Sequence, residues 1–406
     1  MSSLRSRPCS PAVKTPLEDD DLLSEILLRL PPQPSSLPRA SLVCKRWHGL
    51  ASDPGFFRRF RRHHRRNPPP LLGVFVRGDD LSFVSALEAP DLLPPGRFSL
   101  QRRDGGRFMP LGCRHGLVLI FNITPNQMLV WDPVTGDQHR LAIPPGIATH
   151  GEKTVIHGAV LRSVFADAHF QVVLTVADND DKQHKRALAC VYSSETGSWG
   201  DLISSPLPSE VPTGGFHPIF VDIANLPTVF TGIPAVLAGN SVYWMLVGIF
   251  FGILEFDLEK QSLAVIRVPV HMLDNGQIWI MRAEGGGLGL LFLSYSDCSI
   301  QLWKRKTDPD GVASWALGKT IELHKLLSLK SRQVTVTILG IAEENNVVFL
   351  LASGGLFTIH LEPLQFKKLC ETNFGPHYHP FESVYTAEKG VAVEHDAADL
   401  LHHTYI

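Results

Sequence analysis

The chain has 406 residues, 44% hydrophobic and 19% charged, a composition typical of a globular protein with a sizeable core and not of a disordered chain. The length is about twice that of a common domain and therefore favours one large domain with a smaller one. The formal net charge of −2 excludes a strong overall attraction to nucleic acid or to a membrane surface. The six cysteines form no Cys-x-x-Cys pair, which indicates reduced thiols in a cytoplasmic or nuclear setting.

The first predicted element is a short amphipathic helix within residues 17–30. Asp19 to Asp21 fall in its first turn, where negative charge is favourable, and Pro31-Pro32 ends it. Residues 1–15 are polar, lack an apolar signal core and are expected to be a disordered tail. Apolar residues recur at helical spacing and predict one apolar face, made of Leu22, Leu23, Ile26, Leu27 and Leu30.

A second helical segment is predicted to start near Pro38. It places Leu42, Val43, Trp47 and Leu50 on one stripe, and a turn then leads to three phenylalanines, Phe56, Phe57 and Phe60. Two such short segments, with nothing beyond them to complete a core, are interpreted as a docking module that borrows its core from a partner. The alternative is an ordinary helical hairpin packed on the next domain.

Residues 17–60 resemble the F-box, the helical motif that binds the Skp-type adaptor of cullin–RING ubiquitin ligases. Val43-Cys44-Lys45-Arg46-Trp47 is similar to the core of the family signature. The opening differs, because the chain has Glu18-Asp19 where F-boxes usually have Leu-Pro. The resemblance implies a set of adaptor-binding residues with Trp47 as an anchor: Leu22, Leu23, Ile26, Leu27, Leu30, Pro31, Leu42, Val43, Cys44 and Trp47.

A basic run, Arg58 to Arg66, separates this predicted F-box module (residues 16–62) from the rest of the chain. Residues 63–70 are interpreted as a linker, since the run leads into Asn67-Pro68-Pro69-Pro70, a semi-rigid polyproline stretch. A run this basic serves either as a solvated helix end or as a nucleic-acid or nuclear-address segment.

Residues 71–395 predict an all-β domain, followed by a tail over residues 396–406. The apolar stretch Val242 to Leu254 is too short to cross a membrane and contains two glycines, so two buried strands joined by a turn are expected there. A loose unit of three strands with polar turns recurs five times, starting near Gly116, Phe170, Asn240, Leu288 and Val347.

Five similar units favour small antiparallel sheets arranged radially, as in a β-propeller of about six or seven blades. Residues 71–108 and 376–390 are expected to supply a further blade and the closing strand. The alternative fold is a large β-sandwich. Phrases such as Trp131-Asp132-Pro133-Val134-Thr135-Gly136 and Gln301-Leu302-Trp303-Lys304 also resemble the C-terminal domains of large plant F-box families, especially those of grasses. That resemblance implies a propeller-like interaction domain and names no target.

No catalytic, metal-binding or cofactor-binding residue is predicted. The chain has no Gly-x-Ser-x-Gly elbow, and the glycine-rich stretch at Glu284 to Gly289 lacks the Lys-Ser/Thr of a phosphate loop. The histidines at 377, 379, 402 and 403 lack helical i, i+4 spacing and a nearby cysteine. Acidic residues fall in predicted turns, where carboxylates are usually solvated caps: Asp132, Glu195, Asp257, Asp308, Asp310, Glu343 and Glu344.

The function that the resemblance implies is target recognition for a Skp–cullin–F-box ubiquitin ligase. The partners are then a Skp-type adaptor, through it a cullin, and a target protein that binds the β domain at residues the sequence leaves unknown. Two alternatives stay open. One is a scaffold or nuclear regulator that works outside a ligase, and the other is a carbohydrate-binding or hydrolytic propeller.

Overall fold

In the computed structural model, the chain folds into two compact units. One unit is helical and contains residues up to Arg66 together with those from Tyr385 onward, and the other runs from Asn67 to Val384. The structure describes residues 17, 19–64, 67–77, 81–98, 100, 107–148, 156–162, 169–178, 185–208, 228–248, 250–269, 272, 276–326, 336–352, 355–371 and 378–386.

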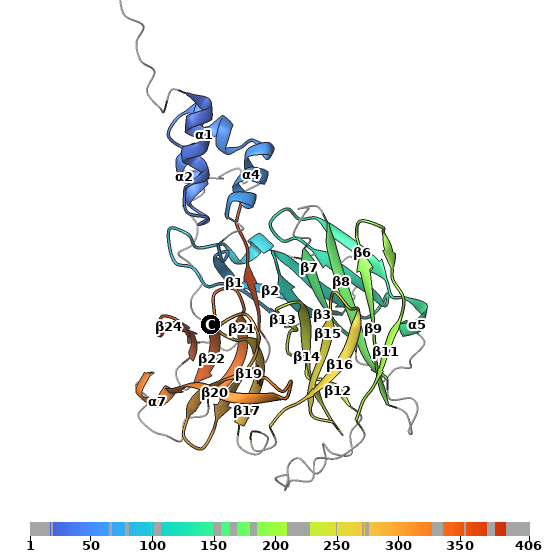
Figure 1. Cartoon of the computed structure of the whole chain (residues 1–406). Coiled ribbons are helices and arrows are strands. Elements are labelled where there is room, and N and C mark those ends of the chain that lie inside the picture. The colour runs from blue at the N-terminus through green and yellow to red at the C-terminus, as the bar shows by residue number, and fades with distance from the viewer. Residues whose placement is uncertain are drawn as a thin grey trace, which may run out of the picture. The chain divides into compact units, whose positions relative to one another are not determined.

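The helical unit has four described helices: α1 (Asp20–Leu28), α2 (Ser36–Ser41), α3 (Lys45–Ala51) and α4 (Pro54–His64) (Figure 1). The last of these corrects the expectation that nothing completes the core of the module. Helix α4 packs against α1 and α3, and buries Phe56, Phe57 and Phe60 almost completely. The unit thus has a small core of its own. Helix α4 also runs to His64, two residues beyond the boundary expected from the sequence.

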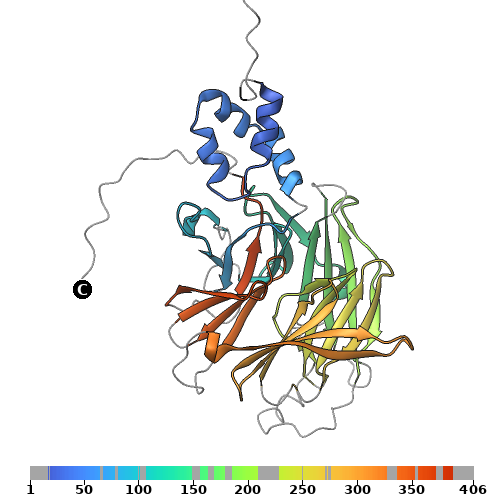
Figure 2. The same cartoon turned by 60° about the vertical axis from the view of Figure 1, so that its left-hand side comes forward.

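The all-β unit contains six antiparallel sheets, which form a six-bladed β-propeller (Figures 1 and 2). The first blade contains β3 (Phe108–Arg114), β4 (Leu117–Asn122), β5 (Gln127–Trp131) and β6 (Gln138–Ala142). The second contains β7 (Ile156–Arg162), β8 (Phe170–Asp178), β9 (Arg186–Ser193), β10 (Ser198–Trp199) and β11 (Ile203–Pro206). The third contains β12 (Val229–Phe230), β13 (Val236–Ala238), β14 (Ser241–Val247), β15 (Gly252–Asp257) and β16 (Ser262–Arg267).

The fourth and fifth blades are regular four-stranded sheets. Their strands are β17 (Gly276–Arg282), β18 (Leu288–Ser294), β19 (Ser299–Thr307) and β20 (Ala313–Glu322); β21 (Thr337–Ala342), β22 (Val347–Ala352), β23 (Gly355–His360) and β24 (Gln365–Cys370). Short helical turns accompany the strands: η1 (Pro95–Phe98), α5 (Pro145–Ala148) and α7 (Leu323–Leu326).

The sixth blade closes the ring with both ends of the β unit. Its strands are β1 (Leu71–Arg77), β2 (Leu81–Ser85) and β25 (Tyr378–Glu382), in the order β2-β1-β25. Strand β25 lies beside β3 of the first blade and β21 of the fifth. The expectation that residues 71–108 and 376–390 provide a blade and a closing strand is therefore confirmed, as is the propeller itself.

The stretch from Val242 to Leu254 forms parts of β14 and β15, which pair as neighbours, as predicted. Among the described residues, no helix is long and apolar enough to span a bilayer, the longest having 11 residues. Apolar cores fill the spaces between adjacent blades, and an aromatic cluster of Phe75, Phe83, Phe98, Trp131 and Phe381 joins the sixth blade to the first.

In blades one to five, the innermost strand is the part of the repeat that the sequence did not predict. The five predicted units correspond to the second, third and fourth strands of blades one to five. In β21, a glycine interrupts the inner strand at a point where the neighbouring strand β25 approaches closely. At Gly340 of β21, a Cβ atom would lie 2.8 Å from the backbone oxygen of Tyr378 in β25, closer than two such atoms pack. A glycine here interrupts the apolar run of β21 and weakens its strand signal.

Candidate functional site

Helix α1 begins where its sequence gives it a capping residue. The Asp19 carboxylate accepts hydrogen bonds from the backbone N–H groups of Asp21 and Leu22, at 2.9 and 3.0 Å. Asp20 and Asp21 occupy the first turn, where the helix dipole favours negative charge. A cap of this kind stabilises a helix by about 1 kcal/mol. The start of α1 is thus fixed locally by residues 19–22.

Helix α1 has two apolar faces, where the sequence predicted one. Leu23 and Leu27 are 0% exposed and point into the core that α4 completes, whereas Leu22 and Ile26 remain 50% and 40% exposed. The buried pair is therefore occupied by contacts within the unit and has no surface to offer a partner in this structure. The exposed pair is the part of α1 available for docking.

The second predicted helix is two short helices separated by an exposed turn. Leu42 N–H donates to the Arg39 carbonyl and Val43 N–H to the Ala40 carbonyl, tight i to i−3 bonds that end α2. Cys44 is extended and begins α3. The turn holds Leu42 and Val43 out of the core, 84% and 62% exposed. Side chains of this size are rarely left so open without a binding role when they lie next to other exposed apolar residues.

Arg46 joins the turn to the start of α1. Its Nε lies 2.6 Å from Asp20 Oδ1, and its Nη1 donates to the Leu17 carbonyl oxygen at 2.6 Å. Because Arg46 lies in the first turn of α3, directly after the exposed turn, these bonds hold that turn near the N-terminal end of α1. Leu17 is itself 47% exposed and was not among the predicted binding residues.

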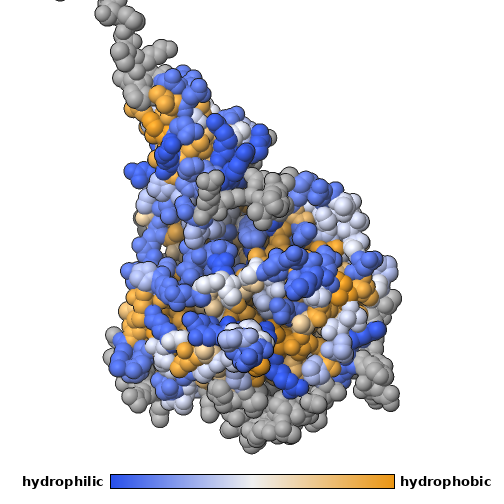
Figure 3. Space-filling view, in the orientation of Figure 1, coloured by the Kyte–Doolittle hydropathy of each residue, from blue (hydrophilic) through white to orange (hydrophobic). Residues whose placement is uncertain are grey.

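We call Leu17, Leu22, Ile26, Leu42 and Val43 the docking surface. Its members are the exposed large apolar residues of the described helical unit, where apolar surface is also visible in Figure 3. Of the other predicted adaptor-binding residues, Pro31 and Cys44 are exposed, and Leu30 and Trp47 are partly buried. Leu23 and Leu27 support this surface from below and do not belong to it. Sequence patterns alone do not distinguish the buried leucines from the exposed ones, because the difference depends on where α4 packs.

The basic run of α4 is partly tied into the helical unit. Arg59 donates to Ser24 Oγ at 2.9 Å, and Arg61 Nε donates to Thr386 Oγ1 at 2.9 Å. Arg62 and His63 are exposed and, with Leu28 and Arg59, line a shallow hollow of about 300 Å³. Arg65 and Arg66 lie outside the described residues, so the full predicted run is not seen.

His64 is the basic residue of α4 that turns inward. Its Nε2 lies 3.0 Å from the Leu28 carbonyl oxygen and its ring lies 4.4 Å from that of Phe60. Burial, followed by the neighbouring His63, lowers the pKa of His64, because both disfavour a second positive charge there. His64 therefore belongs to the core of the helical unit, as a neutral partner of α1.

A buried ion pair connects three blades near the propeller axis. Arg114, at the end of β3, lies 2.6 Å from Glu343 Oε1 and also donates to the Ala235 carbonyl oxygen at 2.6 Å. Arg114 and Glu343 come from the first and fifth blades, and Ala235 comes from the third. Glu343 is thus not the solvated turn acid that the sequence indicated. It serves as the partly buried partner of Arg114.

A second carboxylate, that of Glu382, links the closing strand β25 to the turn that follows β21. Glu382, the last residue of β25, accepts hydrogen bonds from the backbone N–H of Glu344 and from the N–H and Nδ2 of Asn345, at 3.1, 2.8 and 2.7 Å. The Asn345 amide also donates to the Pro69 carbonyl at 2.8 Å. Burial raises the pKa of Glu382 to about 7, against the opposing effect of these donors.

These carboxylates are engaged as structural partners, and turn acids elsewhere act locally. Asp132 accepts from the N–H groups of Val134 and Thr135 and lies 3.0 Å from Arg162. Asp257 caps its own turn through Glu259 and Lys260, and these bonds lower its pKa. Within the described ranges, no group of three His, Cys, Asp or Glu residues is placed to hold a metal. His377, His402 and His403 lie outside those ranges.

The loops between blades, where a target would be expected to bind, are only partly described. All six connections between successive blades include residues outside the described ranges, such as 101–106, 149–155 and 209–227. The target-binding residues therefore stay unassigned there. The predicted tails at residues 1–15 and 396–406 also lie outside the described part of the chain. No disulfide joins any of the five described cysteines.

Comparison with known proteins agrees with this arrangement. A family model described as "F-box protein AT5G49610-like, beta-propeller" matches residues 111–386, and one described as "F-box-like" matches residues 20–63. No curated protein matches the chain at a significant level.

The solved structures that resemble the chain are distant. The WD40 domain of SCAP from fission yeast is 13% identical over 67% of this chain and 55% of its own length, with a TM-score of 0.31. A protein of unknown function from Bacteroides caccae is 9% identical over 78% of this chain and 99% of its own, with a TM-score of 0.39. Apo AztD from Citrobacter koseri is 13% identical over 76% and 71%, with a TM-score of 0.33.

With TM-scores below 0.5, these structural likenesses add nothing to the assignment. The family models support an assignment, because the propeller model alone covers more than half of the chain and the F-box-like model covers α1 to α4. The chain therefore belongs to the F-box proteins with an AT5G49610-like β-propeller.

Proposed function

We propose that this F-box protein is the substrate-recognition subunit of a Skp–cullin–F-box ubiquitin ligase. The observation that carries the proposal is the docking surface, which leaves five large apolar side chains open on a unit whose core is already complete. Apolar residues grouped in this way mark a protein-binding surface. A Skp-type adaptor is the partner because the F-box-like model covers the helices that form this surface.

The proposed mechanism is proximity without bond chemistry. The helical unit binds the adaptor, the adaptor connects the chain to a cullin that carries a ubiquitin-charged enzyme, and the propeller holds the target. Holding a target lysine near the ubiquitin thioester raises their effective concentration. The pairing of Glu343 with Arg114, and of Glu382 with Asn345, supports a non-catalytic role, because neither carboxylate is left for general acid or base chemistry. The chain would do this in the cytoplasm, the nucleus or both.

The test is co-purification of the full chain with a Skp-type adaptor. Val43 and Val312 provide a matched pair, because they are 62% and 60% exposed and lie in different units. Val43→Asp is expected to abolish co-purification, since it places a charge in the buried centre of the interface. Val312→Asp is expected to leave it unchanged. No binding by the intact chain would reject the proposal and favour a scaffold or nuclear regulator that depends on the Arg58 to Arg66 run.

A further inference from the structure

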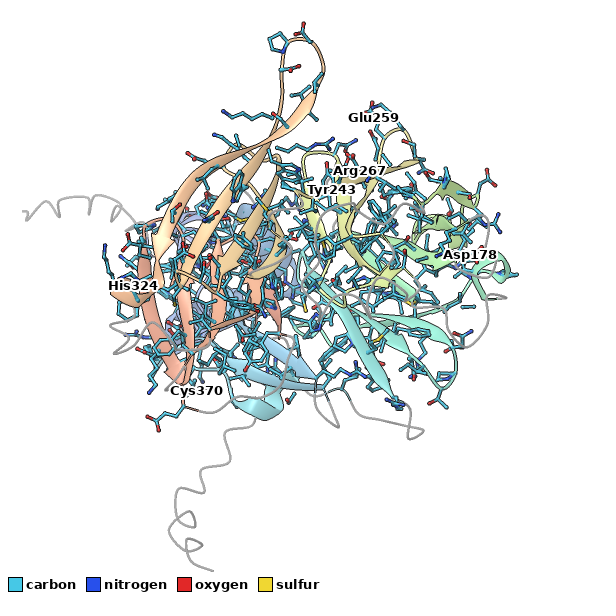
Figure 4. All side chains as sticks on the ribbon, turned by 90° about the horizontal axis from the view of Figure 1, so that it is seen from below. Asp178, Tyr243, Glu259, Arg267, His324 and Cys370 are labelled. Carbon is cyan, nitrogen blue, oxygen red and sulfur yellow. The ribbon has the colours of Figure 1, made fainter. Side chains whose placement is uncertain are left out.

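The hairpin of β19 and β20 in the fourth blade is the longest in the described propeller. Its strands have 9 and 10 residues, and the hairpin extends beyond the neighbouring strands in Figures 2 and 4. The turn at its tip is closed by Asp308, whose carboxylate accepts from the Val312 N–H at 2.7 Å. A blade of this propeller does not need strands of that length, since β23 and β24, the outer hairpin of the fifth blade, have six residues each.

Strand β20 is the outer edge of its sheet. The sheet order is β17-β18-β19-β20, and no described strand pairs with the far side of β20. Soluble proteins usually protect such an edge with charged residues, proline or a bulge. The six residues from Val312 to Leu317 contain neither charge nor proline. A bulge and Lys319 come only after them. This stretch is therefore open to pairing with another strand.

The two faces of the hairpin differ in chemistry. On one face, Arg305 is opposite Trp315 and Trp303 is opposite Leu317. Trp315 and Trp303 pack partly on the core between the third and fourth blades, and Trp315 Nε1 donates to the Arg267 carbonyl at 3.2 Å. Leu317 stays 50% exposed at the edge. An added strand would find Trp315 and Leu317 at the edge of this face, with Arg305 on the strand behind them.

The other face is basic, with Lys306 exposed and Lys304 partly buried. Lys304 is opposite Ala316, and Lys306 is opposite Ser314. On the edge side, only the small side chains of Ala316 and Ser314 stand beside these lysines on β20. A strand added to β20 would lie about 10 Å from β19, since neighbouring strands are about 4.8 Å apart. Lysine and glutamate side chains together can span that distance. Carboxylates on this face of an added strand would therefore reach both lysines.

We propose that β20 binds an extended peptide of a target protein in which acidic and apolar residues alternate, by adding it to the sheet as a further strand. Backbone hydrogen bonds to the edge give the affinity, and the alternation gives the specificity. Apolar residues lie beside Trp315 and Leu317, and acidic residues lie opposite Ser314 and Ala316 within reach of Lys306 and Lys304. The role as a ligase target site rests on the proposed function, whereas peptide binding itself does not.

The experiment is calorimetric titration of the full chain with a blocked octapeptide of alternating valine and glutamate. The reference peptide has the same residues in two blocks, four valines followed by four glutamates. Saturable binding of the alternating peptide only is the expected result. Binding of neither peptide, or equal binding of both, would overturn the proposal, because a sheet edge reads alternation and not composition.

Charge-reversal variants locate the binding strand. Lys304→Glu/Lys306→Glu is expected to weaken binding at least tenfold, since two attractions become repulsions. Lys367→Glu/Lys368→Glu makes the same charge change on β24, the outer strand of the fifth blade, and is expected to change binding less than twofold. Equal losses in both variants would show a general charge effect and reject β20 as the site.

Two further readouts separate the remaining explanations. Light scattering measures whether the chain is a dimer, and a dimer that the peptide dissociates would assign β20 to a second copy instead of a target. Adaptor co-purification from the same preparations separates peptide binding from the ligase role. Peptide binding without adaptor binding would refute only the ligase role, and adaptor binding without peptide binding would refute only the role of β20.

Discussion

Truncating Leu42 and Val43 together is the most direct test of the docking surface. At about 0.8 kcal/mol for each buried carbon group, Leu42→Ala removes about 2.4 kcal/mol of potential burial and Val43→Ala about 1.6 kcal/mol. Scaled by their open fractions of 84% and 62%, the losses are about 2 and 1 kcal/mol. The double variant should therefore bind a Skp-type adaptor about 150-fold more weakly.

The same change should leave the fold intact, because both side chains are already in water. Surface substitutions of this kind alter unfolding free energy by less than about 0.5 kcal/mol. The matched core variant, Leu23→Ala/Leu27→Ala, should do the opposite and destabilise the helical unit by about 2–5 kcal/mol per site. Calorimetric titration with the adaptor measures the first effect, and hydrogen exchange of α1 and α4 amides measures the second.

A Leu42 and Val43 double variant that binds the adaptor within threefold of the unmodified chain would refute the role of the docking surface. Loss of protection of the α1 amides in that variant would also count against it, since weaker binding would then reflect unfolding. A core variant with unchanged amide protection would show that Leu23 and Leu27 are not packed as described. The first variant tests the exposed turn between α2 and α3, and the second tests the buried face of α1.

Three further changes test the structural bonds. Asp19→Ala should cost α1 about 1 kcal/mol, seen as faster exchange of its first amides, whereas Asp19→Asn should keep most of the cap. Arg114→Met should destabilise the propeller by about 3–5 kcal/mol in denaturant unfolding, because it leaves Glu343 buried without its cation, and Arg114→Met/Glu343→Leu should recover most of that loss. The pKa of Glu382 is about 7 when folded, above the ordinary glutamate value of 4.5, so stability from its protonation is present below pH 4.5 and is lost as pH rises to about 7. That loss is on the order of 3 kcal/mol, and Glu382→Gln should remove this part of the pH dependence of unfolding.

Local rules were sufficient for much of the fold. The acidic first turn and the proline stop predicted α1, and turn residues such as Asp132 and Gly136 predicted the hairpins, because those signals act within a few residues. The glycine break after Val247 correctly separated β14 from β15. The propeller followed from repetition of these hairpins, and the closing strand from the leftover segments at both ends of the β region.

What the sequence did not provide depends on contacts between distant residues. Leu22 and Leu23 are adjacent and equally apolar, and only the packing of Phe56 and Phe60 decides which of them is buried. Gly340 of the inner strand β21 is required because β25 of the next blade approaches it. The pairing of Arg114 with Glu343 spans 229 residues, so no local pattern indicates it.

The docking surface and the β20 edge are open for different physical reasons. Leu42 and Val43 lie outside the core of the helical unit and expose apolar surface area, so they suit a preformed apolar groove in a folded adaptor. Strand β20 offers a line of backbone donors and acceptors, so it suits a segment without structure of its own. Because the two sites share no residue and belong to different units, their free-energy changes should add when variants are combined. Independent sites of this kind suit the proposed function, in which binding to a ligase does not depend on whether a target is bound.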